Sequence, residues 1–128
     1  MPLINLATLL RDMDLYISQH AIYINKLEKA IENKEPFEHK DCHHCNFGAK
    51  WDELVKPVKE QLPEDLKPYV EEIETVHCQF HDISKQIDPT QPKETDKQNF
   101  ETMEDLSTKL FQDLLKLKHI LKERGFLE

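Results

Sequence analysis

Two histidines spaced one helical turn apart are the residues of this chain best suited to chemistry. His77 and His81 lie in a segment whose apolar residues recur every third or fourth position, which predicts a helix over about residues 65–87. Residues i and i+4 of a helix share one face, so both imidazoles can point at one spot inside a bundle. Imidazole is a common zinc ligand, and this pair supplies half of a tetrahedral site. Exposed pairs with this spacing also arise by chance, so the metal hypothesis needs two further ligands.

A third histidine, His20, lies within the apolar seam of a predicted first helix. The seam follows a heptad pattern through Leu3, Leu6, Leu10, Met13, Ile17, His20, Ile24, Leu27 and Ile31. An unpartnered imidazole in a dry seam costs roughly 1–3 kcal/mol. A core histidine bonded to a carbonyl would avoid that cost, and so would a histidine bound to a metal. Both interpretations remain open for His20.

A cluster of histidine and cysteine follows a loop at residues 33–40. The possible ligands here are His39, Cys42, His43, His44 and Cys45. Asp41 is a predicted N-cap for a short helix that carries Phe47, Trp51, Leu54 and Val55 inward. A thiol near a helix N-terminus is expected to have a lowered pKa, which favours the thiolate that binds metals. Spacing does not choose among the five ligands, and a polar loop with incidental His and Cys is the alternative.

The remaining chain predicts a final helix and completes a bundle. A connector with two prolines at residues 88–94 precedes Thr95-x-x-Gln98, which has the pattern of a capping box. The stripe of this helix runs through Phe100, Met103, Leu106, Leu110, Leu114, Leu117 and Leu121. His119 lies off the stripe and is expected to be solvated. Four helices with narrow apolar faces predict an all-α, antiparallel four-helix bundle, formed as a single domain over residues 1–128. A metal bound by the candidate histidines and cysteines would lie inside this bundle.

Composition narrows the classes of function. Only 2 glycines and 33% charged residues fit a helical protein. The net charge of −8 argues against binding to nucleic acid or to an anionic membrane surface. No apolar run approaches the roughly 20 residues of a membrane span, and no signal peptide is recognisable, so we expect a cytoplasmic protein. Three cysteines in such a compartment are expected to stay free of structural disulfides.

Taken in order, these motifs resemble the chemoreceptor zinc-binding family. The family pattern is a histidine on the first helix, then Cys-x-(Phe/Leu)-Gly-Lys-Trp, then His-x-x-x-His on the third helix; here His20, Cys45 to Trp51, and His77 with His81 stand in these places. Members are bacterial four-helix regulatory domains found on chemoreceptors and diguanylate cyclases. The resemblance implies a Zn²⁺ site made of His20, Cys45, His77 and His81.

The resemblance covers roughly residues 20–87 and departs from the family at one point. Ala49 places Trp51 three residues after Gly48, where the family has two, and one residue rotates a helical side chain by about 100°. Tyr23 matches an aromatic residue that the family often carries. Cys42, His43, His44 and Cys78 have no match among the family's ligands, and Cys78 is expected to be a small core residue.

Three imidazoles and one thiolate suit tetrahedral Zn²⁺ and leave no open position, so a regulatory module and not an enzyme is expected. Loss of zinc or oxidation of Cys45 would free the helices, which fits chemotaxis signalling or redox sensing through a partner protein. One alternative is a di-iron bundle of hemerythrin type, but this class needs inward carboxylates that the first helix lacks. The other alternative is a purely structural helical protein.

The first helix carries more apolar surface than one core requires. A second stripe contains Leu9, Tyr16, Tyr23 and Ala30, with Leu15 and Ile22 further round the helix. This stripe predicts either a wide face towards the core or a homodimer surface, and the resemblance to paired family members favours the homodimer.

Overall fold

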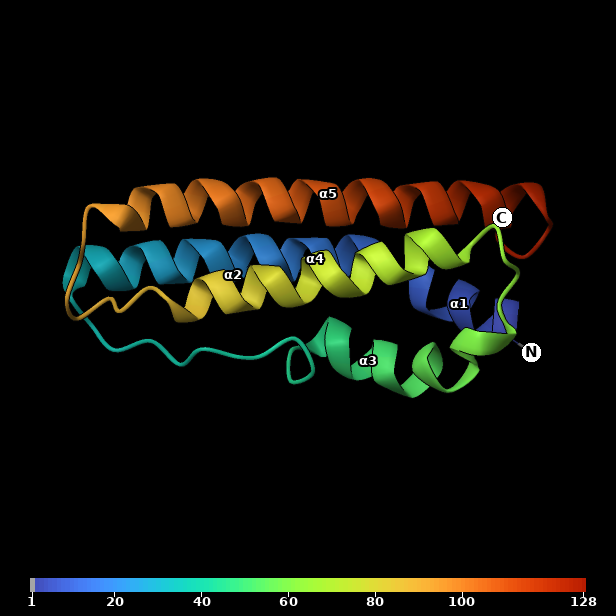
Figure 1. Cartoon of the computed structure of the whole chain (residues 1–128), viewed down its shortest axis with the longest axis horizontal. Helices are drawn as coiled ribbons and strands as arrows, with labels where there is room; N and C mark the ends of the chain where they lie inside the picture. The colour runs from blue at the N-terminus through green and yellow to red at the C-terminus, as the bar shows by residue number, and fades with distance from the viewer. Residues whose placement is uncertain (1) are drawn as a thin grey trace.

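The computed structural model describes residues 2–128, which form helices and contain no strand. The elements in chain order are α1 (Pro2–Leu10), α2 (Met13–Asn33), α3 (Asn46–Leu54), the 3-10 helix η1 (Lys56–Gln61), α4 (Lys67–Lys85) and α5 (Thr95–Glu123). Helices α2, α4 and α5 lie side by side along the length of the molecule, and α3 covers one side of them (Figure 1). The helices α2, α3, α4 and α5 alternate in direction along the chain, so the predicted all-α antiparallel bundle is confirmed.

The predicted first helix is two helices. The chain forms a turn at Arg11 and Asp12, between α1 and α2, although neither residue is a helix breaker. Helix α1 lies at one end of the bundle, where it packs against α3, η1 and the C-terminal part of α5 (Figure 1). The seam residues Leu6, Leu10 and Met13 are all buried, so the heptad pattern predicted burial correctly while missing the turn.

Two apolar clusters make up the core. The larger one joins residues of α1, α2, α3, α4 and α5, and the smaller one contains Ile24, Leu27, Phe80, Ile87 and Met103. The stripe predicted for α5 is buried from Leu110 to Leu121. Three histidines of α2 and α4 are buried as well, although histidine is a polar residue; they are His20, His77 and His81.

Two predicted helix caps are wrong. Asp41 does not cap α3: its Oδ1 accepts the backbone N–H of His43 at 2.8 Å and of His44 at 3.0 Å, and so closes the turn before the helix. Thr95 is the first residue of α5 and not its cap. The hydrogen bond at the start of α5 comes instead from Asp96 in its first turn, whose Oδ2 accepts the backbone N–H of Lys93 at 2.8 Å.

Candidate metal centre

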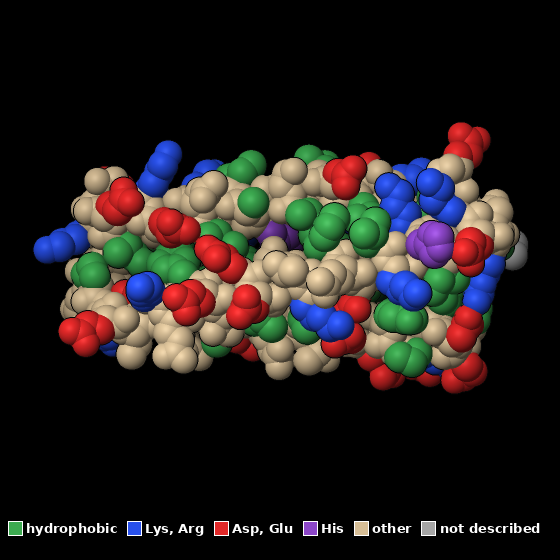
Figure 2. All heavy atoms as spheres, turned by 90° about the horizontal axis from the view of Figure 1, so that it is seen from above, with side chains coloured by type: hydrophobic (Ala, Val, Ile, Leu, Met, Phe, Trp, Pro, Cys, Tyr) green, Lys and Arg blue, Asp and Glu red, His purple; other side chains and the backbone are tan. Residues whose placement is uncertain are grey.

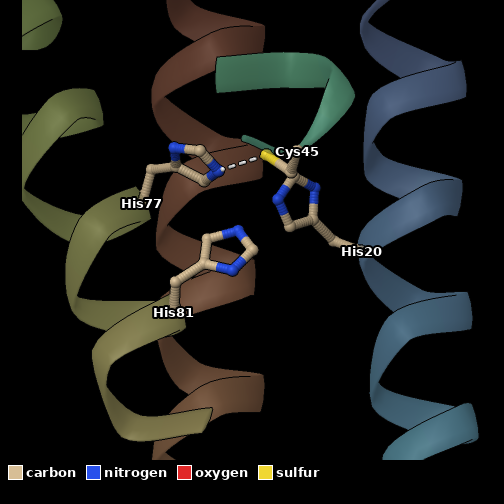
Figure 3. A group of neighbouring side chains, drawn as sticks. All are labelled: His20, Cys45, His77 and His81. Atoms are coloured by element: carbon tan, nitrogen blue, oxygen red, sulfur yellow. Dashed lines mark hydrogen bonds between the residues drawn. The ribbon is translucent and has the colours of Figure 1, made fainter. Parts of the chain in front are cut away.

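Three histidines and one cysteine converge at the middle of the bundle. His20 comes from α2, Cys45 precedes α3 as its N-cap, and His77 and His81 come from one face of α4. One ligand atom of each residue lies within 4.8 Å of the ligand atoms of the other three. Figure 3 shows the side chains pointing at a common point from three directions. The Nε2 of His77 and the Sγ of Cys45 are 3.2 Å apart.

The ring of His20 is oriented by the backbone of its own helix. Its Nδ1 lies 2.7 Å from the carbonyl oxygen of Tyr16. A carbonyl can only accept, so Nδ1 carries the proton and Nε2 carries the lone pair. That Nε2 is buried and has no hydrogen-bond partner. A metal-binding histidine has this arrangement, in which a bond to the other ring nitrogen fixes the tautomer.

His81 is the most deeply buried of the three histidines and the least satisfied. Its side chain is 1% exposed, and neither ring nitrogen has a hydrogen-bond partner. A buried polar group without a partner costs about 1–3 kcal/mol. A metal ion bound at this point would satisfy one nitrogen of His81 and the Nε2 of His20 together. The residues present therefore fit Zn²⁺.

The three imidazoles are held in the neutral form. Burial, followed by the nearby His20 and His81, lowers the pKa of His77 to about 2. Burial, followed by His20, lowers the pKa of His81 to about 4. Burial also lowers the pKa of His20. Neutral imidazole is the form that binds metal, so at neutral pH protons compete little for these nitrogens.

Cys45 behaves differently from the prediction. Its position at the start of α3 predicted a lowered pKa, but burial raises the pKa of the thiol. The backbone N–H of Gly48 donates to Sγ at 3.3 Å, which opposes this effect without overcoming it. The sulfur is therefore a thiol in the metal-free protein, and binding a cation would deprotonate it.

Gly48 sets the path of the loop that carries Cys45. A Cβ atom at this position would lie 1.7 Å from the carbonyl oxygen of Cys42, so only glycine allows the loop to pack this closely on α3. The sequence motif contained this glycine, but the contact that requires it became apparent only from the fold.

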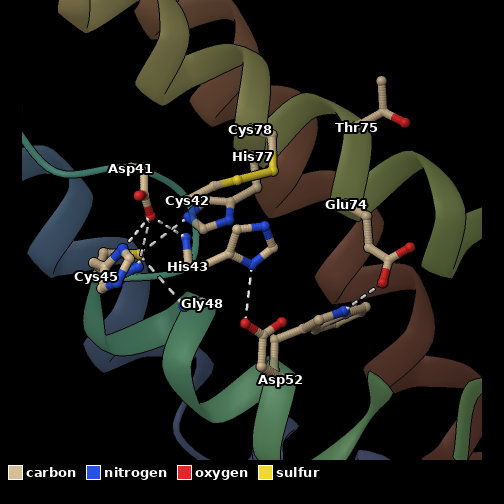
Figure 4. Close-up of a disulfide and its surroundings, with 12 residues drawn as sticks. Asp41, Cys42, His43, Cys45, Gly48, Asp52, Glu74, Thr75, His77 and Cys78 are labelled. Carbon is tan, nitrogen blue, oxygen red and sulfur yellow. Dashed lines mark hydrogen bonds and ion pairs between the residues drawn. A yellow bond between two sulfur atoms is a disulfide. The ribbon is translucent and has the colours of Figure 1, made fainter. Parts of the chain in front are cut away.

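Cys42 and Cys78 form a disulfide, which contradicts the expectation of free thiols. Their Cα atoms lie 4.8 Å apart, and the bond joins the loop before α3 to α4 (Figure 4). Cys78 is only half-buried, so its assignment as a small core residue was also wrong. Cys78 follows His77 and is rotated by about 100° around α4, away from the histidine cluster. Cys45 is the free cysteine of residues 2–128.

The other histidines of the loop lie outside the group of four. The Nδ1 of His39 is 2.9 Å from the hydroxyl of Ser84, and that of His44 is 2.6 Å from Asp41. The Nδ1 of His43 lies 2.9 Å from Asp52. His119 is exposed beside Glu123, as its place off the stripe predicted.

The extra residue Ala49 is absorbed within α3. Trp51 is buried and packs on Phe47, one turn earlier, with ring centroids 5.6 Å apart. Its Nε1–H donates to Glu74 of α4 at 2.8 Å. A further contact that sequence reasoning missed lies beside His81, where the hydroxyl of Tyr23 is 2.7 Å from that of Ser84. Ser84 gave no sequence signal beyond its place one turn past Phe80.

Comparison with known families gives the class of protein. The family described as "chemoreceptor zinc-binding domain" matches residues 20–87, which is more than half of the chain. The chain belongs to this family and is a zinc-binding domain of the all-α type. Comparison with curated proteins and with solved structures found no significant match. Within residues 2–128, no helix has both the length and the apolar character needed to cross a bilayer.

Proposed function

We propose that this chain is a regulatory module that holds one Zn²⁺ ion through His20, Cys45, His77 and His81. The observation that supports this ligand set most strongly is the burial of imidazole nitrogens without partners beside a thiol. His20 would bind through Nε2, because its Nδ1 donates to a carbonyl. Cys45 would supply the one negative charge among four ligands. The group contains no carboxylate, which disfavours the di-iron alternative.

A site with four protein ligands suits regulation better than catalysis. Hydrolytic zinc sites keep one position open for water, and four side chains fill a tetrahedral ion. The proposed ligands come from α2, from the start of α3 and from α4, so the ion would tie these elements together. Its loss would loosen α3, whose one ligand is Cys45. We therefore assign the module a sensory role and no enzymatic one, with residues 1–128 acting as a single domain.

The partner is proposed from the family. Its members are regulatory domains of bacterial signalling proteins, so we expect this module to act in the cytoplasm on a chemoreceptor or a diguanylate cyclase pathway. The free protein would pair with a second copy through α2. The acidic net charge of −8 supports a protein partner over nucleic acid.

The ligand set is tested by metal analysis of single variants. Purified protein with its disulfide intact should contain one zinc per chain. Cys45→Ala should weaken zinc binding by more than about 100-fold, beyond the loss typical of residues that only support a ligand. The double variant Cys42→Ala with Cys78→Ala removes the disulfide without leaving an unpaired thiol; it is the control and should cost much less. A greater effect of this double variant or of His44→Ala would show that the ligands are assigned wrongly.

Oxidation gives a second test of the sensory role. Because Cys42 and Cys78 are paired, Cys45 is the thiol open to an oxidant such as hypochlorite. Conversion of this sulfur to sulfenic or sulfinic acid would replace a strong zinc ligand with a poor one. Titration with hypochlorite should release zinc to a dye as mass spectrometry records oxidation of Cys45. Zinc release while Cys45 stays reduced would contradict a redox role for this residue.

A further inference from the structure

A second group of metal-binding side chains lies outside the proposed centre. One ligand atom each of Cys42, His43 and Cys78 lies within 4.8 Å of the other two. The group is joined by the disulfide between its cysteines and lies at the surface between the loop before α3 and α4 (Figure 4). None of its members belongs to the group that contains Cys45, so the following inference stands apart from the proposed function.

We propose that Cys42, Cys78 and His43 form a second metal site that reduction opens and oxidation closes. In the oxidised protein the two sulfurs are bonded to each other and bind no cation. In the reduced protein they are two thiol ligands beside an imidazole, a donor set that suits a borderline-soft divalent ion such as Zn²⁺.

His43 is oriented for this role by Asp52. The Nδ1 of His43 lies 2.9 Å from Oδ2 of Asp52, a residue of α3, the helix that follows the loop. The carboxylate of Asp52 accepts this hydrogen bond, so Nδ1 of His43 carries the proton and Nε2 carries the lone pair. A carboxylate bound to one ring nitrogen while the other faces a metal is a recurrent arrangement in zinc proteins. His44 also has a carboxylate on its Nδ1, that of Asp41, but its ring does not lie in the group with the two cysteines.

The loop keeps the two cysteines together without their covalent bond. Gly48 holds the backbone of Cys42 against α3, and Asp41 closes the turn that follows by accepting two backbone N–H groups. Helix α3 is in turn held on α4, where Nε1–H of Trp51 donates to Glu74 at 2.8 Å. We therefore expect the Cα atoms of Cys42 and Cys78 to stay near 4.8 Å apart after reduction. Two thiolates on one zinc ion have their sulfurs about 3.8 Å apart, which rotation of the side chains can provide.

There is room at the site for an ion and a water molecule. A cavity of about 430 Å³ lies between α3 and α4 and is lined by Cys42, His43, Asp52, Glu74 and Cys78, among others. The side chain of His43 is 56% exposed, so the site opens to solvent. Water would complete a tetrahedral ion held by three side chains. The site would thus be accessible and exchangeable, in contrast to the buried centre.

A thiol reductant can supply the electrons and protons that reduction of the Cys42–Cys78 disulfide requires. One dithiol, or two molecules of a small thiol, breaks the bond between Cys42 and Cys78. Two electrons and two protons pass to the protein sulfurs, and the reductant sulfurs join as a disulfide. When Zn²⁺ then binds, the two thiol protons leave to solvent. The complex with one neutral imidazole carries no net charge.

The test compares zinc content before and after reduction. The full chain is prepared with the disulfide intact, and a second sample is reduced with a phosphine that is removed under anaerobic conditions. Both are equilibrated with Zn²⁺, freed of excess and analysed for metal and protein. We expect one zinc per chain in the oxidised protein and two in the reduced protein. A reduced protein that binds no more zinc than the oxidised one would overturn the proposal.

Three variants assign the extra zinc to its ligands. The double variant Cys42→Ser with Cys78→Ser should show no gain on reduction. His43→Gln should weaken binding of the extra zinc by at least about tenfold. His44→Gln, the matched control at the next position, should leave it unchanged. Retention of the extra zinc in the double variant, or equal effects of the two histidine variants, would overturn the site.

A final variant separates this site from the buried centre. Cys45→Ser should remove or weaken the zinc that is bound in the oxidised protein while leaving the gain of one zinc on reduction. If Cys45→Ser instead abolished the gain on reduction, the extra zinc would belong to Cys45, and the second site would be excluded. If Cys45→Ser left both zinc ions in place, the proposed function would fail while the second site survived.

Discussion

Burial prepares the ligands of the central cluster in opposite ways. It lowers the pKa of His77 and His81, so each ring is neutral and keeps one nitrogen free of a proton, but it raises the pKa of Cys45, so its sulfur keeps its proton. Without a bound cation, the three imidazoles and the thiol of the cluster therefore carry no charge. The cation then gains three neutral ligands at once and displaces a single proton from the fourth. The cost of the metal-free state lies in the buried nitrogens of His20 and His81, which have no partner.

The first prediction concerns Gly48. Gly48→Ala would place a methyl group 1.7 Å from the carbonyl oxygen of Cys42, so the loop or α3 must shift. We expect a loss of about 1–3 kcal/mol in the free energy of unfolding, together with weaker zinc binding, because Cys45 lies on the same loop. Denaturant unfolding and a competition dye measure the two effects. Ala49→Ser, at the exposed next position, is the control; an equally small effect of both variants would show that the contact is unimportant.

The second prediction concerns pH and Asp113, a buried residue of α5 far along the chain from any proposed ligand. Burial, followed by the neighbouring Glu72, raises the pKa of Asp113 from 3.8 to about 6. The folded state therefore holds this proton more tightly than the unfolded state. The contribution of Asp113 to the free energy of unfolding falls as pH rises from about 4 to 6, and the loss is complete above the folded pKa.

Asp113→Asn removes this penalty, since the amide stays neutral. We expect the variant to be more stable than the original protein at pH 7, by on the order of 1 kcal/mol, and to lose this advantage below about pH 4. Urea unfolding of both proteins at the two pH values measures the difference. Asp105→Asn, an exposed change on the same helix, should alter stability little at either pH. A gain that is equal at both values would contradict the electrostatic cause.

At the scale of elements, sequence periodicity predicted which faces are buried but not how the connections run. The heptad seam placed His20 inside, and the four-residue spacing placed His77 and His81 on one face, because helical geometry alone determines both. Cys45 was selected from its neighbours only through the resemblance to a family. The bond between Cys42 and Cys78 joins residues 36 positions apart, and it depends on the path of the loop over α4, which no local pattern encodes.

The third prediction concerns metal removal and helix α3. The proposed ligands come from three elements, so the ion binds the folded protein and not the unfolded chain. At a thousandfold excess over the dissociation constant, this linkage contributes about 4 kcal/mol. A strong chelator should then lower Tm by more than about 10 °C. The same chelator applied to Cys45→Ala should cause a smaller fall. A fall of only a degree or two in the original protein would mean that zinc does not support the fold.

At the scale of the whole molecule, the apolar stripe of α2 was predicted to be either a wide face towards the core or a homodimer surface, and its residues differ in their exposure. Tyr16 is buried in the core of its own chain and Tyr23 is half-buried, so both serve the bundle. Leu15 and Ile22, two turns apart on one face, remain 55% and 50% exposed. Hydrophobic side chains also lie between charged ones on the face seen from above, where acidic groups are numerous (Figure 2). A surface of α2 that binds a second copy would therefore be formed by Leu15 and Ile22, on a protein whose net charge is negative.

The fourth prediction follows from this combination of exposed aliphatic residues and charge. Two copies that pair through Leu15 and Ile22 would bury apolar area, but each carries a net charge of −8, and the two charges repel. Added salt screens the repulsion over about 10 Å at 0.1 M and leaves the apolar contact intact. We therefore expect a homodimer whose dissociation constant falls as salt is raised, measured by sedimentation equilibrium at tens of micromolar protein.

Leu15→Glu combined with Ile22→Glu should give a monomer at every salt concentration. Leu115→Glu, which introduces the same charge at a residue of α5 that is 48% exposed, should leave the dimer largely intact. A monomer mass for the original protein at high salt would rule out the pairing, and dissociation by Leu115→Glu alone would place the contact on α5 instead.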